Sequence, residues 1–215
     1  ELQVGQFPII AGTVGQSRWV DRLVAEGKVD TTGVTGRWEA YTLQLIENPS
    51  EGISQALVIL GGTPRGTAYG LFELSRRIGV SPYIWWADVQ PAPQSTLYLS
   101  GDRTEVEAPS VQYRGLFIND EDWSLQPWSW RTFSPAKPGL ISATTYKQVF
   151  KLLMRLRANT IWPAMHESST PFFLIPGAKE AADSCGIVIG TSHCEPMMRN
   201  NAGEWNTKER GAYNY

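Results

Sequence analysis

Cysteine and histidine are scarce in this chain of 215 residues, which has two of each. Two cysteines are too few for a disulfide framework, and their spacing matches no zinc motif. No apolar run approaches the roughly 18 residues that a membrane-spanning helix needs. Lysine and arginine form no run, and the formal net charge is −2, which argues against binding to a nucleic-acid backbone. We therefore expect no membrane span and no nucleic-acid partner.

Aromatic residues, in contrast, are abundant. The chain has 7 Phe, 9 Trp and 8 Tyr, and six of the tryptophans lie between positions 85 and 162. With 42% hydrophobic residues, this composition is typical of a folded protein rather than a disordered one. The length predicts one or two domains with a substantial core.

The first hundred residues predict a mixed α/β domain. Residues 41–47 (YTLQLIE) alternate as a half-buried strand does, and residues 56–60 (ALVIL) form a short, fully apolar strand. A GGTPRG turn follows, which matches neither nucleotide-binding glycine motif and predicts a structural turn. Apolar residues at helical spacing then predict a helix over residues 68–78.

A domain boundary is predicted where the composition changes. Between positions 90 and 109 the chain is rich in Pro, Gln and Ser with scattered charges. This places an N-terminal α/β domain at residues 1–108 and a second domain at residues 111–215.

The second half has a regular βαβαβ pattern. Its strands are predicted at residues 113–118, 160–164 and 187–190, and its helices at residues 144–157 and 177–184. Right-handed crossover connections would make the three strands parallel, with their C-terminal ends at one edge.

Polar and ionisable residues directly follow each of these strands. In parallel α/β folds this edge is where ligands bind. Asp120 is the strongest single candidate, because a carboxylate at a strand mouth suits sugar hydroxyls or general acid–base catalysis; the alternative is that it caps a turn. The residues concerned are Asn119, Asp120, Glu121, His166, Glu167, His193 and Glu195.

Two further features allow a functional and a structural interpretation. Residues 122–143 form a long connection with three tryptophans, whose rings either stack on sugar faces or pack together in a small core. His166, His193 and Glu195 match no established metal-binding spacing, so that a hydrogen-bonding role is favoured and no metal site is predicted.

Four stretches of the chain resemble glycoside hydrolase family 115, the xylan α-1,2-glucuronidases. These are RGTAYGLFELSRRIGVSPYIWWADV, YRGLFINDEDWSLQPW, LLMRLRANTIWPAMH and GIVIGTSHCEPMMRNNAGEW. The resemblance implies an N-terminal α/β domain followed by a (β/α)8 TIM barrel, of which about three βα units fit here. Because a complete barrel needs about 200–250 residues, we expect this chain to be part of a larger enzyme and to be inactive alone.

The resemblance also implies a reaction and a site. Family members remove glucuronic or 4-O-methylglucuronic acid branches from xylan with inversion, and no cofactor is implied. Asn119 and Asp120 would line the uronic-acid pocket together with Trp162 and His193, and His166 and Glu195 are weaker matches. The general acid would come from later strands. The expected partner is glucuronoxylan or a related oligosaccharide; the full-length enzyme could form a homodimer, in an extracellular or periplasmic location.

Three alternatives remain open from the sequence. The first is a different two-domain glycosidase, acting on another uronic acid or an N-acetylhexosamine. The second is a non-catalytic carbohydrate-binding fragment. The third is a metallohydrolase that uses His166, His193 and Glu195.

Overall fold

The structure is a computed structural model, and it divides the chain into two compact units. The first unit is Glu1–Gln112 and the second is Tyr113–Tyr215. Both combine a β-sheet with helices, which confirms the mixed α/β class. The structure describes residues 7–98, 103–104, 106–119, 122–192, 198–200 and 204–212.

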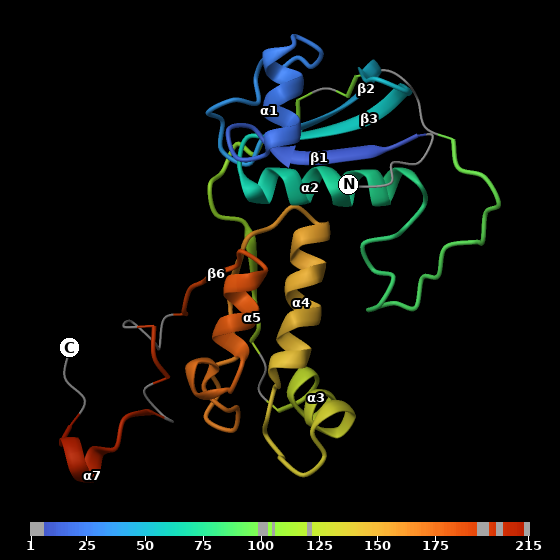
Figure 1. Cartoon of the computed structure of the whole chain (residues 1–215). Helices are drawn as coiled ribbons and strands as arrows, with labels where there is room; N and C mark the ends of the chain where they lie inside the picture. The colour runs from blue at the N-terminus through green and yellow to red at the C-terminus, as the bar shows by residue number, and fades with distance from the viewer. Residues whose placement is uncertain are drawn as a thin grey trace. The chain divides into compact units, whose positions relative to one another are not determined.

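The first unit contains a three-stranded sheet in the order β1–β3–β2 (Figure 1). Strand β1 (Ile9–Thr13) runs parallel to β3 (Ile53–Gly61), and β2 (Tyr41–Ser50) runs antiparallel to β3. Helix α1 (Arg18–Ala25) and helix α2 (Pro64–Arg77) lie on opposite faces of this sheet.

The apolar run in β3 is buried because both faces of the strand are covered. Alternate side chains of a strand point to opposite faces. Ala56, Val58 and Leu60 belong to a buried cluster with Val20 and Leu23 of α1.

Helix α2 covers the other face at close range. Leu57 and Ile59 are buried there. A Cβ atom on Gly70 would overlap Ile59 Cγ2, so the missing side chain lets α2 approach the sheet. The helix begins directly in the predicted turn, where the Thr63 hydroxyl accepts a hydrogen bond from the Gly66 N–H at 3.1 Å.

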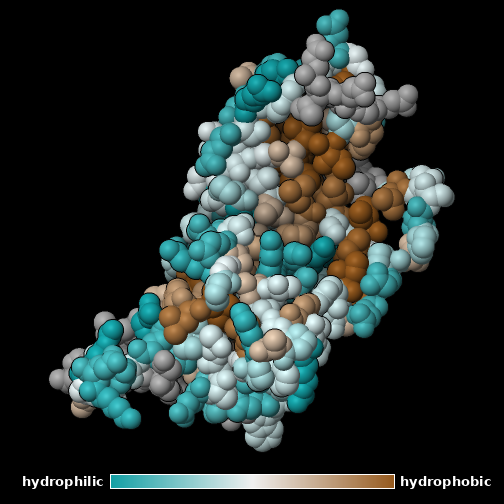
Figure 2. All heavy atoms as spheres, turned by 60° about the horizontal axis from the view of Figure 1, so that its bottom comes forward, coloured by the Kyte–Doolittle hydropathy of each residue, from teal (hydrophilic) through white to brown (hydrophobic). Residues whose placement is uncertain are grey.

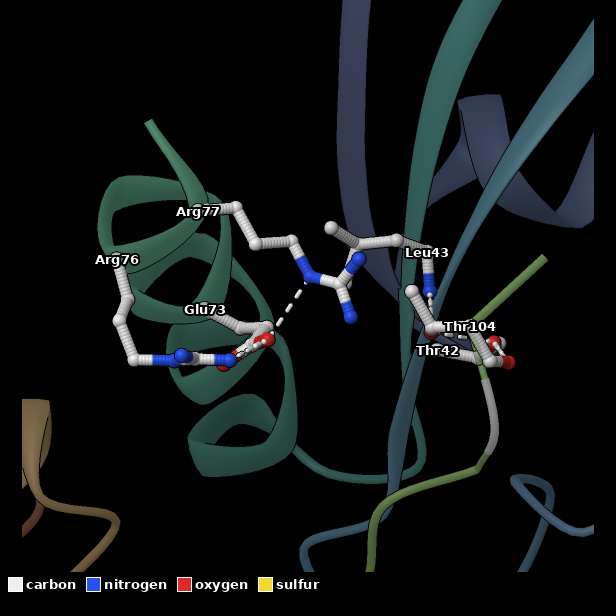
Figure 3. A network of polar contacts seen from close by, with 6 residues as sticks. All are labelled: Thr42, Leu43, Glu73, Arg76, Arg77 and Thr104. Atoms are coloured by element: carbon white, nitrogen blue, oxygen red, sulfur yellow. Dashed lines mark hydrogen bonds and ion pairs between the residues drawn. The ribbon is translucent and has the colours of Figure 1, made fainter. Parts of the chain in front are cut away.

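A buried carboxylate fixes the end of α2 (Figure 3). Glu73 accepts hydrogen bonds from Arg76 Nε at 2.9 Å and from Arg77 Nε at 2.8 Å. The hydrogen bond to Glu73 also raises the pKa of the Arg76 guanidinium above its usual value. The two arginines lie in the last turn, where positive charge favours the helix dipole.

The same view shows that Thr104, which lies after α2 in the chain, is hydrogen-bonded to β2 of the sheet. The Leu43 N–H donates to Thr104 Oγ1 at 2.9 Å, and the Thr42 hydroxyl donates to the Thr104 carbonyl at 3.0 Å (Figure 3). Glu107 forms an antiparallel bridge with Tyr41. Residues in the Pro-rich stretch therefore contribute to the first unit.

The predicted strands and helix of this unit are confirmed as β2, β3 and α2. We did not predict β1 and α1. Their lengths of five and eight residues give little periodic signal, and such short elements depend on tertiary packing for their stability.

The second unit is built on three parallel strands in sequential order, as the βαβαβ pattern predicts. These are β4 (Gly115–Phe117), β5 (Thr160–Trp162) and β6 (Val188–Ile189). All three are shorter than the predicted ranges, because regular pairing covers only two or three residues of each.

Two helices connect these strands and pack against each other (Figure 1). Helix α4 (Ala143–Arg155) and helix α5 (Ala178–Ser184) confirm the predicted helices. Tyr146 of α4 has an edge-to-face contact with Phe172, with ring centroids 4.9 Å apart. Phe172 begins the short 3-10 helix η1 (Phe172–Leu174), which joins this core to α5.

The long connection with three tryptophans, residues 122–143, contains a helix that we did not predict. Helix α3 (Leu125–Phe133) occupies its first half and packs on α4. The Ser129 hydroxyl lies 2.6 Å from Thr145 Oγ1 in a buried contact between the two helices. A further short helix, α7 (Thr207–Arg210), lies near the end of the chain and was not predicted.

Candidate carbohydrate site

The sheet of the second unit has one covered face and one open face. Ile161 is fully buried, whereas its neighbour Trp162 is 43% exposed. Since successive residues of a strand point to opposite faces, Ile161 lies on the buried face of β5 and Trp162 on the open face. Phe117 pairs with Trp162 in the register of β4 and β5, which places both on the open face.

The open face carries exposed aromatic rings. Phe117 and Trp162 are in edge-to-face contact, with ring centroids 5.9 Å apart. They border a hollow of about 290 Å³, which is also lined by Tyr113, Gly115, Leu116 and Thr160. Figure 2 shows that hydrophobic residues also reach the surface on the face it draws. Such exposed aromatic surface is typical of a binding or packing site.

Glycine shapes the surroundings of the Trp162 ring. Gly190 directly follows β6, and its N–H donates to the Ile161 carbonyl at 2.9 Å. A Cβ atom there would lie 2.5 Å from Trp162 Cδ1 and would overlap Nε1. Only glycine therefore leaves room for the indole ring at the end of β6.

Asn119 lies where the sequence placed it, just past β4, and is exposed. The preceding Ile118 N–H donates to the Trp162 carbonyl at 2.9 Å, so the pairing of β4 with β5 extends to the residue before Asn119. Asn119 thus follows β4 and Trp162 ends the neighbouring parallel strand β5, at the same edge of the sheet.

His166 belongs to a polar cluster between the segments that follow β4 and β5. Its Nδ1 atom lies 2.9 Å from Ser168 Oγ and 3.5 Å from Asp122 Oδ1. Ser168 Oγ in turn donates a hydrogen bond to Asp122 Oδ1. Asp122 has a φ of 72°, a left-handed conformation that aspartate adopts more readily than most residues.

Met165, one residue before His166, anchors the segment after β5. The side-chain amide of Asn200 donates to the Met165 carbonyl at 2.8 Å. The backbone N–H and the hydroxyl of Ser192 both contact Met165 Sδ at 3.4 Å. Residues that follow β6 therefore hold the segment that carries His166.

Four of the candidate residues from the sequence, Asp120, Glu121, His193 and Glu195, lie outside the described residues. The structure thus brings His166 together with Asp122 and Ser168, and Trp162 together with Phe117.

Asp122 and Ser168 are the polar residues that our sequence analysis missed. The sequence contained a hint of both, since Asp122 ends the NDED run that follows β4 and Ser168 lies two residues after His166. Trp123, next to Asp122, is 84% exposed, so its ring does not pack in a small core as one of our two interpretations had it.

No group of three or more His, Cys, Asp or Glu side chains suited to a metal ion occurs among the residues that the structure describes. In the same part of the chain, no helix has the length and apolar character to cross a membrane.

Parallel βα units with polar residues past the strand ends, beside exposed aromatic rings, are typical of the ligand-binding edge of α/β enzymes. Residues 106–215, just over half of the chain, match the family described as Glycosyl hydrolase family 115. The chain belongs to this family.

A solved structure supports the same assignment over nearly the whole chain. It is described as a novel family GH115 4-O-methyl-α-glucuronidase, BtGH115A, with specificity for decorated arabinogalactans. The similarity has a TM-score of 0.84 and 48% sequence identity, and it covers 99% of this chain but 26% of that one. This chain therefore spans about a quarter of the length of that structure. No curated protein matches this chain.

Proposed function

We propose that this chain is part of an α-glucuronidase that hydrolyses α-1,2-linked glucuronic or 4-O-methylglucuronic acid branches of a plant polysaccharide. The observation that carries the proposal is the edge at the ends of β4 and β5, where Asn119 follows β4 and Trp162 ends β5 in a family 115 chain. An indole ring beside amide and hydroxyl groups suits a sugar, which has an apolar face and polar edges.

The second unit is proposed to supply the first strands of a TIM barrel. Three observations support this arrangement: the strands are parallel, they follow one another in sequential order, and α4 and α5 connect them. In such a barrel the open face that carries Phe117 and Trp162 would be the inner one. The active site would then lie at the C-terminal strand ends, where Asn119 is located.

The proposed reaction is hydrolysis with inversion. One carboxylic acid protonates the leaving oxygen of the polysaccharide, while a second carboxylate activates a water on the opposite face of the sugar, the two being about 6.5–9.5 Å apart. We propose that Asp120 positions this water or binds the uronic acid, and that the acid comes from another segment of the enzyme. The chemistry needs no cofactor.

Two plant polysaccharides are candidate substrates. The family resemblance points to glucuronoxylan, and the similar solved structure is described as specific for decorated arabinogalactans. The shared chemistry is a terminal, α-linked uronic acid. Release of this acid from each polysaccharide, measured side by side, would distinguish the two.

The decisive experiment measures uronic-acid release by the full-length enzyme that carries this segment. Asp120→Ala and Trp162→Ala should each lower kcat/KM at least about a hundredfold, the scale of losing a key interaction in the transition state. Glu51→Gln is the matched control, since Glu51 is exposed in the turn between β2 and β3 of the first unit and has no proposed role. Unchanged activity of the Asp120→Ala enzyme would exclude this residue from the pocket. The chain of 215 residues alone should release no uronic acid.

We also propose an extracellular or periplasmic location, since the substrates are cell-wall polysaccharides. Homodimerisation of the full-length enzyme is proposed from the family resemblance. Fractionation of the native host and sedimentation of the purified enzyme test these two points.

A further inference from the structure

We infer that Asp122 and Ser168 are positioning residues that hold His166 with its hydrogen on Nδ1, which leaves Nε2 to accept a hydrogen bond from a sugar hydroxyl. The nature of the ligand rests on the proposed function. The placement of the hydrogen does not, because it follows from contacts within this chain.

Asp122, Ser168 and His166 form a chain of three groups in which each hydrogen can be assigned. A carboxylate only accepts, so the contact between Ser168 Oγ and Asp122 Oδ1 uses the single hydrogen of the serine hydroxyl. Ser168 Oγ then offers only lone pairs to Nδ1 of His166, 2.9 Å away. The hydrogen of that bond must therefore be on Nδ1.

A second contact favours the same placement. Asp122 Oδ1 also lies 3.5 Å from His166 Nδ1. A lone pair on Nδ1 would face both the carboxylate and the serine oxygen, whereas an N–H is attracted to both. The bond at one ring nitrogen sets the state of the other, so that Nε2 of the neutral ring is an acceptor.

Nε2 is the nitrogen left for a ligand. It has no hydrogen-bond partner among the residues that the structure describes, and the imidazole is substantially exposed. A uronic acid offers hydroxyl donors and a carboxylate that only accepts. An acceptor at Nε2 selects a hydroxyl and repels the carboxylate, which gives His166 a defined part in orienting the sugar ring.

Nitrogen NMR of the full chain labelled with ¹⁵N-histidine tests this directly. The chain has two histidines, so a His193→Asn variant assigns the signals. At alkaline pH, His166 should show a protonated Nδ1 and an unprotonated Nε2. Asp122→Ala frees the Ser168 hydroxyl to donate to Nδ1, so the hydrogen should move to Nε2.

Two further variants separate this effect from general disturbance. Ser168→Ala should keep the hydrogen on Nδ1, because Asp122 Oδ1 remains near enough to accept it. Glu167→Gln removes a neighbouring charge without touching the three groups, so the hydrogen should stay on Nδ1. A hydrogen on Nε2 in the unmodified chain, or no reversal in Asp122→Ala, would overturn the inference.

Activity then tests the ligand separately. In the full-length enzyme, Asp122→Ala should raise KM up to about tenfold with kcat nearly unchanged, the effect of one neutral hydrogen bond. An enzyme that releases no uronic acid would contradict the proposed function, whereas tautomer reversal in Asp122→Ala would still support the positioning role.

Discussion

Truncation of Ile161 and of Trp162, neighbours in β5, should lower the free energy of unfolding by different amounts, because Ile161 belongs to the core and Trp162 to the open face. Ile161→Ala removes three carbon atoms from a fully buried site. At about 0.8 kcal/mol for each, the lost burial costs about 2.4 kcal/mol. A residual cavity of about 60 Å³ would add about 1.4 kcal/mol, at roughly 24 cal/mol per Å³. The expected loss of stability is therefore about 3–4 kcal/mol.

Trp162→Ala should cost less although it removes a larger side chain. The indole is 43% exposed, so we expect less than about 2 kcal/mol, below the 3–5 kcal/mol typical of a buried aromatic ring. Its effect should instead appear in uronic-acid release.

Hydrogen–deuterium exchange in increasing urea provides the measurement, because it reports on β5 and α4 separately from the first unit. The peptide that contains residues 144–164 gives the local free energy of unfolding for each variant. Equal losses for the two variants would refute the assignment of the two faces. So would a loss of uronic-acid release in Ile161→Ala that persists under conditions where this variant is fully folded.

Three other changes test separate parts of the structure. Gly190→Ala should displace the Trp162 indole and lower kcat/KM for uronic-acid release, while circular dichroism shows an intact fold, since a Cβ there overlaps the ring. Glu73→Gln should lower the free energy of unfolding of the first unit in urea by about 1–3 kcal/mol, since it weakens three charge-assisted hydrogen bonds to a buried carboxylate. Hydrogen bonds from the Thr32 hydroxyl and N–H lower the pKa of Asp30. Their contribution to the stability of the fold is therefore present above the ordinary pKa of aspartate and is lost as pH falls through the lowered value. In Asp30→Asn, the urea midpoint should no longer show this loss of stability at acid pH.

Much of the second unit was predictable because its pattern is repetitive. The spacing of apolar residues predicted α4 and α5, and the alternation of strands and helices predicted three parallel strands. The helix α3 was missed, because the tryptophans and Pro127 of that segment carry no clear helical period.

The candidate site was predictable in part. Polar residues past strand ends pointed to Asn119 and His166, and the family resemblance added Trp162. Neither could show that the Asp122 and Ser168 side chains meet at one ring nitrogen of His166, 44 and two residues away in the chain.

The sequence by itself determined the α/β class, the order of the main elements and the family, because these depend on local periodicity and on long ordered motifs. The tertiary structure decided which face of β5 is open, how closely α2 approaches its sheet at Gly70, and which hydrogen-bond partners His166 has. These depend on contacts between residues far apart in the chain, and no local pattern encodes the distance at which two such side chains meet.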